Sequence, residues 1–209
     1  LVRRANTMRL SGIRADILTR DQVQKEAPYL DFTSQARFPI YGGMLQPDAG
    51  TARHDAVAWG YARAADQLGV DIIQNCEVQD YLWAGERIVG VKTSRGDIGA
   101  GKVAVAVAGH TSVLAQKAGL RLPIESHVLQ AFVTESIKPV VHHVVVWSAT
   151  YFYVSQSDKG GLVFGGHLDR YNSYAQRGNL PNVAETTQGL ASLIPFASRL
   201  RLLRHWGGI

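Results

Sequence analysis

Hydrophobic residues repeat with two different periods along this chain. Between residues 54 and 68, Val57, Tyr61 and Ala65 lie about one helical turn apart, which predicts a helix that ends at Gly69. From Val70 onward the period shifts to two, which is typical of strands. The strands predicted in this part are residues 71–74, 77–83, 87–93 and 103–107, with a hairpin turn at 84–86.

The last of these strands leads into a glycine turn and a helix. Val103, Val105 and Val107 alternate with alanines, as in a strand that is buried on both faces. Residues 109–112 interrupt the run, and a helix capped by Thr111 or Ser112 follows. Such a turn offers backbone N–H groups to an anion or to a cofactor phosphate, or it is an ordinary connection between a strand and a helix.

A different pattern begins after Pro123, with short segments rich in Val, Phe and Tyr. Together with the helices they predict a mixed α/β (α+β) fold that contains a mostly antiparallel sheet. A short helix capped by Thr19 or Asp21 precedes these elements, and a polar loop from Asp169 to Asn182 divides them. The segments predicted after Pro123 are strands at 125–135, 144–148, 151–155 and 162–167 and a helix at 183–193.

Composition narrows the class of protein. The net charge of +5 is modest and scattered, so it does not favour binding to nucleic acid. Cys76 is the only cysteine, which rules out a disulfide framework and suits the reducing cytoplasm, and no apolar run is long enough to span a membrane. We therefore expect a soluble cytoplasmic protein with no membrane or nucleic-acid partner.

Three local motifs do not support the chemistry that they suggest. Residues 99–104 fit a dinucleotide-binding glycine pattern in letters, but a turn precedes them and a strand follows, the reverse of what that motif requires. His142 and His143 are neighbours on a predicted strand and point to opposite faces, so we expect no metal site. Ser112 and Ser155 lack the sequence context of a hydrolase nucleophile.

Longer runs of residues carry a specific resemblance. The runs RHDAVAWG and VDIIQNCEV, with HWGGI at the end of the chain, are similar to the β subunits of heterotetrameric sarcosine oxidases. These subunits belong to the flavoprotein superfamily of D-amino-acid oxidase and glycine oxidase. The resemblance covers nearly the whole chain from Gly42 onward.

The resemblance implies part of an FAD-binding dinucleotide layer interleaved with an antiparallel substrate-binding sheet. Both ends of the family pattern are missing, so we expect an internal piece of a longer subunit that is colourless and inactive alone. The expected parts are substrate-domain helices and a linker at 1–52, the partial flavin layer at 53–122, the substrate sheet and a helix at 123–202, and the start of a return strand to the flavin layer at 203–209.

The implied activity is oxidative demethylation of sarcosine to glycine and formaldehyde, with electrons passed to oxygen. The implied cofactors are non-covalent FAD in the full-length subunit and FMN attached covalently to His54 in the presence of the partner subunit. Glu77, Val78, Ala108, Gly109 and His110 match positions near the dinucleotide. The implied partners are subunits of the α, γ and δ types and a small N-methyl amino acid.

The resemblance also implies a catalytic hairpin that presents an aromatic side chain and a histidine to the flavin. The histidine is His167, and counting back from it places Phe152 at the aromatic position, with Tyr151 and Tyr153 on the other face. A change of one residue in register would bring in Tyr153 instead. The alternative is that all of these side chains have a purely structural role in packing the sheet.

Two rival functions stay open at this point. A related flavin enzyme, such as a glycine oxidase or a dimethylglycine dehydrogenase, would share the fold without needing a histidine at position 54. A non-catalytic binding or assembly module would have neither cofactor nor turnover.

Overall fold

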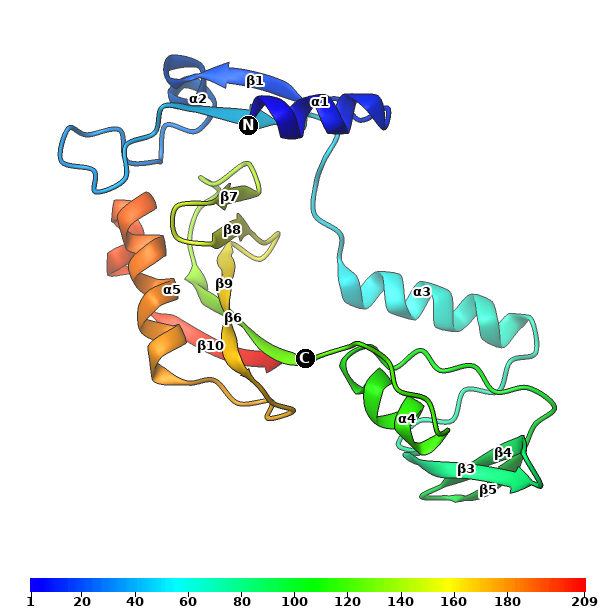
Figure 1. Ribbon diagram of the computed structural model, residues 1–209. Helices are drawn as coiled ribbons and strands as arrows, with labels where there is room; N and C mark the ends of the chain where they lie inside the picture. Colours follow the sequence, from blue (N-terminus) through cyan, green and yellow to red (C-terminus); the bar gives the residue numbers. More distant parts are fainter. The chain divides into compact units, whose positions relative to one another are not determined.

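The computed structural model describes residues 1–209, which form two compact units. The first unit contains residues 1–51 and 128–208, and the second contains residues 52–127 together with Ile209. Figure 1 shows the elements of each unit. Because the first unit is assembled from two separate stretches of sequence, the second unit is an insertion between them.

The first unit is built on a five-stranded sheet with the strand order β10-β6-β9-β8-β7. Its pairs β10/β6, β7/β8 and β8/β9 are antiparallel, as the sequence predicts. The strands are β6 (His127–Ser136), β7 (Val145–Trp147), β8 (Phe152–Gln156), β9 (Gly161–Asn172) and β10 (Leu202–Gly208).

Helix α5 (Leu180–Leu193) packs along this sheet and closes the hydrophobic core (Figure 1). Asn179 caps the helix by accepting a 2.9 Å hydrogen bond from the N–H of Asn182. Phe132 and Phe164 stack beneath it with their ring centroids 5.2 Å apart, and both side chains are fully buried. A short 3₁₀ helix, η2 (Pro195–Arg199), follows α5.

The first 51 residues add two helices and a small hairpin to the same unit: α1 (Val2–Leu10), β1 (Asp16–Thr19), α2 (Arg20–Glu26) and β2 (Gly42–Leu45). Thr19 caps α2 in a reciprocal arrangement with Gln22, which confirms one of the two caps predicted from the sequence. Leu30 and Ile40 join the core of the five-stranded sheet, so this segment is packed onto the sheet.

The second unit contains helices α3 (His54–Gln67) and α4 (Thr111–Lys117), the 3₁₀ turn η1 (Ala108–His110) and a three-stranded antiparallel sheet in the order β3-β4-β5. Strands β3 (Val78–Ala84) and β4 (Arg87–Thr93) pair around a turn in which Gly85 has φ of +62°, and β5 (Gly96–Gly99) follows. The helix at 54–68 and the meander are therefore confirmed.

Two strands predicted for the second unit are wrong, because residues 71–74 and 103–107 have irregular backbones. A strand forms only where a neighbouring strand completes its ladder of hydrogen bonds, and neither segment has such a neighbour in this chain. Val105 remains 40% exposed, whereas the alternating pattern predicts a buried side chain. The hydrophobic pattern of both segments is typical of strands, but this chain supplies no neighbouring strand with which they could pair.

One boundary in the first unit also differs from the prediction. Strand β9 continues to Asn172, so the predicted loop does not begin at Asp169. Strand β10 pairs with β6 at one edge of the five-stranded sheet, and of residues 203–209 only Ile209 groups with the second unit.

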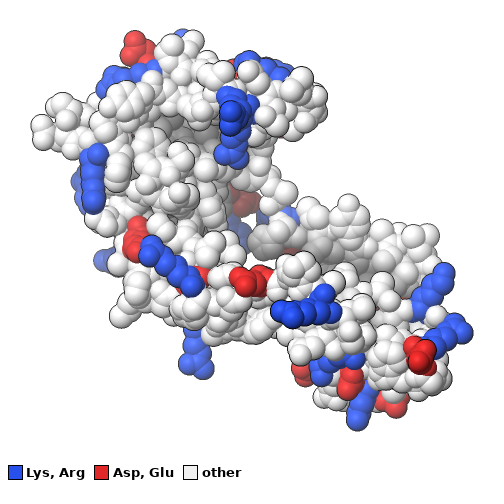
Figure 2. Space-filling view, viewed as in Figure 1, with Lys and Arg blue, Asp and Glu red and all other residues white.

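Charged side chains are spread over the surface. On the face drawn in Figure 2, Lys and Arg stand singly or in small groups with Asp and Glu among them, and no continuous basic surface is seen in this view. Across the chain, no helix has the length and apolar character needed to cross a membrane.

Candidate functional site

An open pocket of about 680 Å³ lies on the five-stranded sheet of the first unit. Its walls come from β6, β9 and β10 and from the start of β8, so residues far apart in the sequence meet here. Apolar groups dominate the lining, and a few polar side chains converge among them, which is the usual character of a small-molecule site. The lining residues are Leu129, Gln130, Ala131, Tyr151, Tyr153, Gly166, His167, Leu168, Arg170, Trp206 and Gly208.

The hairpin between β8 and β9 decides which aromatic side chain faces this pocket. Its loop closes between Ser157 and Gly161, with Gly160 at φ of +89°, and this geometry pairs Phe152 with Gly166. Tyr153 therefore lies on the same face as His167 and lines the pocket. Phe152 is 1% exposed and packs against Phe164, so it belongs to the core and does not line this pocket.

His167 occupies an unusual backbone conformation at the edge of the pocket. Its φ is +53°, which is uncommon outside glycine, and its N–H donates to the carbonyl of Tyr151 at 3.2 Å. The ring Nδ1 lies 3.4 Å from Oε2 of Glu185 on α5, and the side chain is 22% exposed. Along β9, Leu162 and Phe164 are buried before this position and Asp169 is buried after it, so the alternation of the strand changes phase near His167.

Tyr153 presents a phenol hydroxyl at the same site. Burial raises the pKa of Tyr153 above its ordinary value, so the hydroxyl keeps its proton and can donate a hydrogen bond. The ring lies over Gly165, where an added Cβ would be 2.8 Å from the hydroxyl oxygen. Gly165 thus leaves the room that this tyrosine occupies.

A buried polar network supports the floor of the pocket. Gln130 on β6 donates from Nε2 to Oδ1 of Asp169 on β9 at 3.3 Å, and the same oxygen accepts from Nδ2 of Asn179 at 2.6 Å. The N–H of Asn179 donates to Oε1 of Gln130. Since Asn179 also caps α5, the network fixes this helix against β6 and β9.

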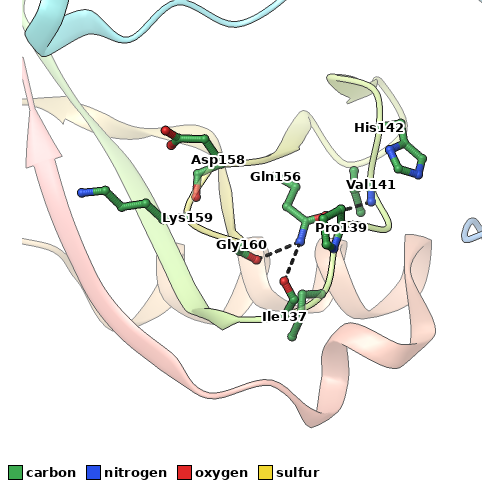
Figure 3. A pocket seen from close by; sticks show the side chains of 9 residues that line it. Ile137, Pro139, Val141, His142, Gln156, Asp158, Lys159 and Gly160 are labelled. Atoms are coloured by element: carbon green, nitrogen blue, oxygen red, sulfur yellow. Dashed lines mark hydrogen bonds between the residues drawn. The ribbon is translucent and has the colours of Figure 1, made fainter.

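A smaller pocket of about 400 Å³ lies at the turn end of the β8/β9 hairpin (Figure 3). Its polar centre is the side chain of Gln156, which accepts from the N–H groups of Val140 and Val141 and donates to the carbonyls of Ile137, Lys138 and Gly160. In Figure 3 Lys159 points away from this side chain. Gln156 is engaged by backbone groups on all sides, which makes it a structural clamp.

The residues that the resemblance assigns to flavin lie in the second unit. His54 is the first residue of α3 and is exposed, beside an ion pair of 3.6 Å between Arg53 and Asp55. The hydrogen bond from the N–H of Ala56 lowers the pKa of Asp55, so that carboxylate is charged at the start of the helix. The histidine ring at this exposed helix start is thus accessible from the solvent.

Glu77 and Val78 lie at the start of β3, and the turn at Ala108, Gly109 and His110 leads into α4, which packs against β3. Glu77 is exposed, and its carboxylate suits the hydroxyl donors of a nucleotide. Ala108 has φ of +46°, and the Cβ position of Gly109 is filled by the side chain of Ile209. The carboxylate of Glu77 can thus accept hydrogen bonds from a ligand, whereas the Cβ position of Gly109 is already occupied by protein.

Sequence reasoning missed three side chains at the larger pocket. Arg170 and Trp206 line it, and Glu185 contacts its histidine. The signal for Glu185 was weak, since it is the one acidic residue of the predicted helix at 183–193. Arg170 gave none, because it lay in a segment predicted to be a loop. No group of three His, Cys, Asp or Glu side chains in the chain has the geometry of a metal site.

Comparisons with known proteins agree on one family and fold. The family model described as FAD dependent oxidoreductase matches residues 1–209. Sarcosine oxidase subunit beta of Rhizobium meliloti is 61% identical over 207 residues, which are 99% of this chain and 50% of that protein. The protein of the same name from Arthrobacter sp is 48% identical over 208 residues, covering 100% of this chain and 51% of that protein. The chain thus spans about half the length of the curated relatives it matches.

Solved structures show the same fold at low sequence identity. L-proline dehydrogenase from P. horikoshii superposes with a TM-score of 0.84 at 24% identity, covering 94% of this chain and 52% of that one. Glycine oxidase from Bacillus cereus gives a TM-score of 0.82 at 18% identity, covering 99% of this chain and 55% of that one. The mixed α/β fold with antiparallel sheets predicted from the sequence is therefore confirmed.

Proposed function

Because the chain belongs to the FAD dependent oxidoreductase family, we propose that it forms the substrate-binding half of a flavoprotein subunit that oxidatively demethylates sarcosine or a similar N-methyl amino acid. The identity of 48–61% to proteins named sarcosine oxidase subunit beta supports this substrate. A single structural observation carries the proposal: His167 and the hydroxyl of Tyr153 share one largely apolar pocket.

The side chains of this pocket divide the work of binding and proton handling. The apolar walls exclude water and favour the neutral amine over the ammonium form of the substrate. His167 binds the amine and takes up its proton, while the protonated phenol of Tyr153 donates a hydrogen bond to the substrate. The flavin, when bound, supplies the two-electron acceptor that the N-methyl group requires.

The direct test is His167→Asn in a full-length subunit assembled with its partners. The rate of flavin reduction by sarcosine should fall by roughly tenfold or more, about 1.4 kcal/mol, while the FAD content is unchanged. Leu203→Asn, on an exposed side chain of β10 outside the pocket, is the control. Equal loss of FAD and of activity would mean that His167 holds the sheet together and would count against the proposal.

The flavin contacts of the second unit are part of the same proposal. Residues 53–122 form part of the flavin layer, with Glu77, Val78, Ala108, Gly109 and His110 beside FAD. The exposed position of His54 at the start of α3 supports the attachment of FMN there, since a helix N-terminus can also receive the phosphate of the cofactor. The partner subunit completes that site.

Peptide mass mapping of the assembled enzyme tests the FMN attachment. An FMN adduct should be found on His54 alone, and His54→Ala should abolish it while FAD stays bound. An adduct on His110 or His127 would overturn this part of the proposal and leave the substrate pocket untouched.

The relatives are named as β subunits, which implies assembly with other subunits. We assign partners of the α, γ and δ types and a cytoplasmic location to the complete protein. Size-exclusion chromatography of the co-expressed subunits tests the assembly, and a β subunit that elutes alone with full activity would refute it.

A further inference from the structure

Helix α5 carries a single acidic side chain, Glu185, and it reaches the pocket histidine. Its Oε2 lies 3.4 Å from Nδ1 of His167, and the two side chains are 50% and 22% exposed. This distance is long for a hydrogen bond, although contacts of this kind tighten when a substrate binds. The proton transfer assigned to His167 above leaves this carboxylate without a role.

The helix that carries Glu185 is held against the sheet by part-buried contacts. Asn179 caps α5 and donates at 2.6 Å to Asp169, which lies on β9 only two residues after His167. One helical turn beyond Glu185, Gly189 lies close to the start of β8, where an added Cβ would be 3.2 Å from Oγ1 of Thr150 and 3.6 Å from Cβ of Phe152. The helix therefore contacts β9 before Glu185 and the start of β8 after it.

The charges around His167 favour the carboxylate of Glu185 as the group that stabilises the protonated ring. The other polar side chains that line the pocket are Gln130, Tyr151, Tyr153 and Arg170, and none of them carries a negative charge when the tyrosines are protonated. A histidine that accepts a proton in an apolar pocket needs a nearby anion to stabilise the imidazolium. Glu185 supplies a carboxylate 3.4 Å from the ring, whereas the carboxylate of Asp169 in the floor of the pocket accepts from Gln130 and Asn179.

We propose that Glu185 is a positioning residue that holds His167 with Nδ1–H toward α5 and Nε2 toward the substrate amine. In this arrangement Nε2 accepts the proton that leaves the ammonium nitrogen of the amino acid. The neutral amine keeps the lone pair of that nitrogen, and the carboxylate of Glu185 stabilises the imidazolium. This inference rests on the proposed function for its substrate, but the orientation of the ring does not depend on it.

A double-mutant cycle in the assembled, FAD-containing enzyme tests the link between the two residues. Glu185→Leu should lower the rate of flavin reduction by roughly tenfold, and Glu185→Gln should lose less because its carbonyl oxygen still accepts from Nδ1–H. In a His167→Asn background Glu185→Leu should cause no further loss. Gln188→Leu, an exposed change one turn away on the same helix, is the matched control and should leave the rate unchanged.

Two outcomes of the cycle would overturn the proposal. A loss that is the same in both backgrounds would mean that Glu185 supports the fold of α5, and the absence of any loss would mean that His167 needs no carboxylate. Circular dichroism and FAD content identify variants that fail to fold, and Glu185→Gln, which keeps the size of the side chain, then decides the question.

A second measurement reads the ring directly and needs no turnover. In ¹⁵N spectra of histidine-labelled enzyme, with the His167 signals assigned by their loss in His167→Asn, the proton should reside on Nδ1 and should move to Nε2 in Glu185→Leu. An unchanged tautomer would refute the positioning role. If the tautomer changes as expected but no N-methyl amine reduces the flavin of the wild-type enzyme, the proposed substrate is wrong and the positioning of His167 stands.

Discussion

Tyr151 and His167 face each other across the β8/β9 pair, and both have left-handed backbones, with φ of +46° and +53°. The N–H of His167 donates to the carbonyl of Tyr151 at 3.2 Å, so the two unusual conformations are coupled. Gly166 precedes His167 on β9 and pairs with Phe152 on β8. A Cβ added to Gly166 would overlap the carbonyl of Tyr151. Strained residues held in place by their surroundings are concentrated at functional sites, and this pair lies at the rim of the pocket.

The backbone of His167 gives a prediction that separates strain from function. A left-handed conformation costs a residue with a Cβ roughly 1–2 kcal/mol and costs glycine almost nothing. His167→Gly should therefore unfold at a higher urea concentration than His167→Ala by an equivalent of about 1 kcal/mol, although both variants lack the imidazole. Both should be equally slow in flavin reduction. If the glycine variant is the less stable of the two, the left-handed conformation is not imposed by the fold.

The register of the hairpin predicts opposite behaviour for neighbouring aromatic residues. Phe152→Ala should destabilise the protein by about 3–5 kcal/mol, because the side chain is 1% exposed and packs in the core. Tyr153→Phe should change the urea midpoint little, since only a hydroxyl is removed, but it should slow flavin reduction. Urea titration and stopped-flow absorbance measure the two effects. A Phe152 variant of normal stability and low activity would restore the register first predicted from the sequence.

Alkaline pH should weaken the fold through Tyr153 and Tyr29, which are partly buried. Burial raises the pKa of Tyr153 and of Tyr29 in the folded protein, so the folded state retains these protons at a pH where the unfolded chain releases them. Stability is therefore fully present below about pH 10, the ordinary range of tyrosine, and falls as pH rises through the higher folded values. Tyr153→Phe should reduce this fall in urea midpoint, whereas Tyr41→Phe, at a side chain that is 85% exposed, should not.

Much of the fold follows from periodicity, because helices and hairpins depend on nearby residues. The helix that starts at His54 and the strand from Arg87 to Thr93 form where the sequence predicts them. The segment from Val103 to Val107 does not form a strand, since its backbone needs partners that local sequence cannot supply. Long-range pairing is the step that a pattern cannot determine.

The candidate site depends on long-range contacts in two places. The resemblance predicts His167, but which of Phe152 and Tyr153 shares a pocket with it depends on the register between β8 and β9. Glu185 reaches His167 because α5 folds back onto the sheet, and no spacing in the sequence encodes that contact. Residue types were thus predictable, while their geometry required the register and the packing.

The Gln156 clamp should be a stability determinant without a role in turnover. Its side-chain amide makes five hydrogen bonds to backbone groups of two loops. Gln156→Leu leaves those groups without partners and should cost about 2–4 kcal/mol, given typical net values for each bond. Gln156→Glu should not restore stability, because a carboxylate has no N–H to donate to the three carbonyls. Loss of activity at normal stability would contradict this and would make the pocket of Figure 3 a functional site.

Gly165 lies close both to the backbone of the adjacent strand and to a side chain of the pocket. An added Cβ would lie 2.7 Å from the carbonyl oxygen of Gln130 and 2.8 Å from the hydroxyl oxygen of Tyr153. The first neighbour is backbone of the adjacent strand and cannot move without disturbing the ladder, so Gly165→Ala should cost about 1–3 kcal/mol. The second is a side chain of the pocket, so flavin reduction should slow as Tyr153 is displaced.

The matched control for that change is Gly50→Ala. Gly50 belongs to the same unit but does not line the pocket, and an added Cβ there meets nothing within 4 Å. It should leave both the urea midpoint and the rate of flavin reduction unchanged. In the double variant of Gly165→Ala with Tyr153→Phe, the clash with the hydroxyl disappears and the clash with Gln130 persists, so the double variant should lose less stability than the two single changes added together. Strict additivity would mean that Tyr153 does not lie over Gly165.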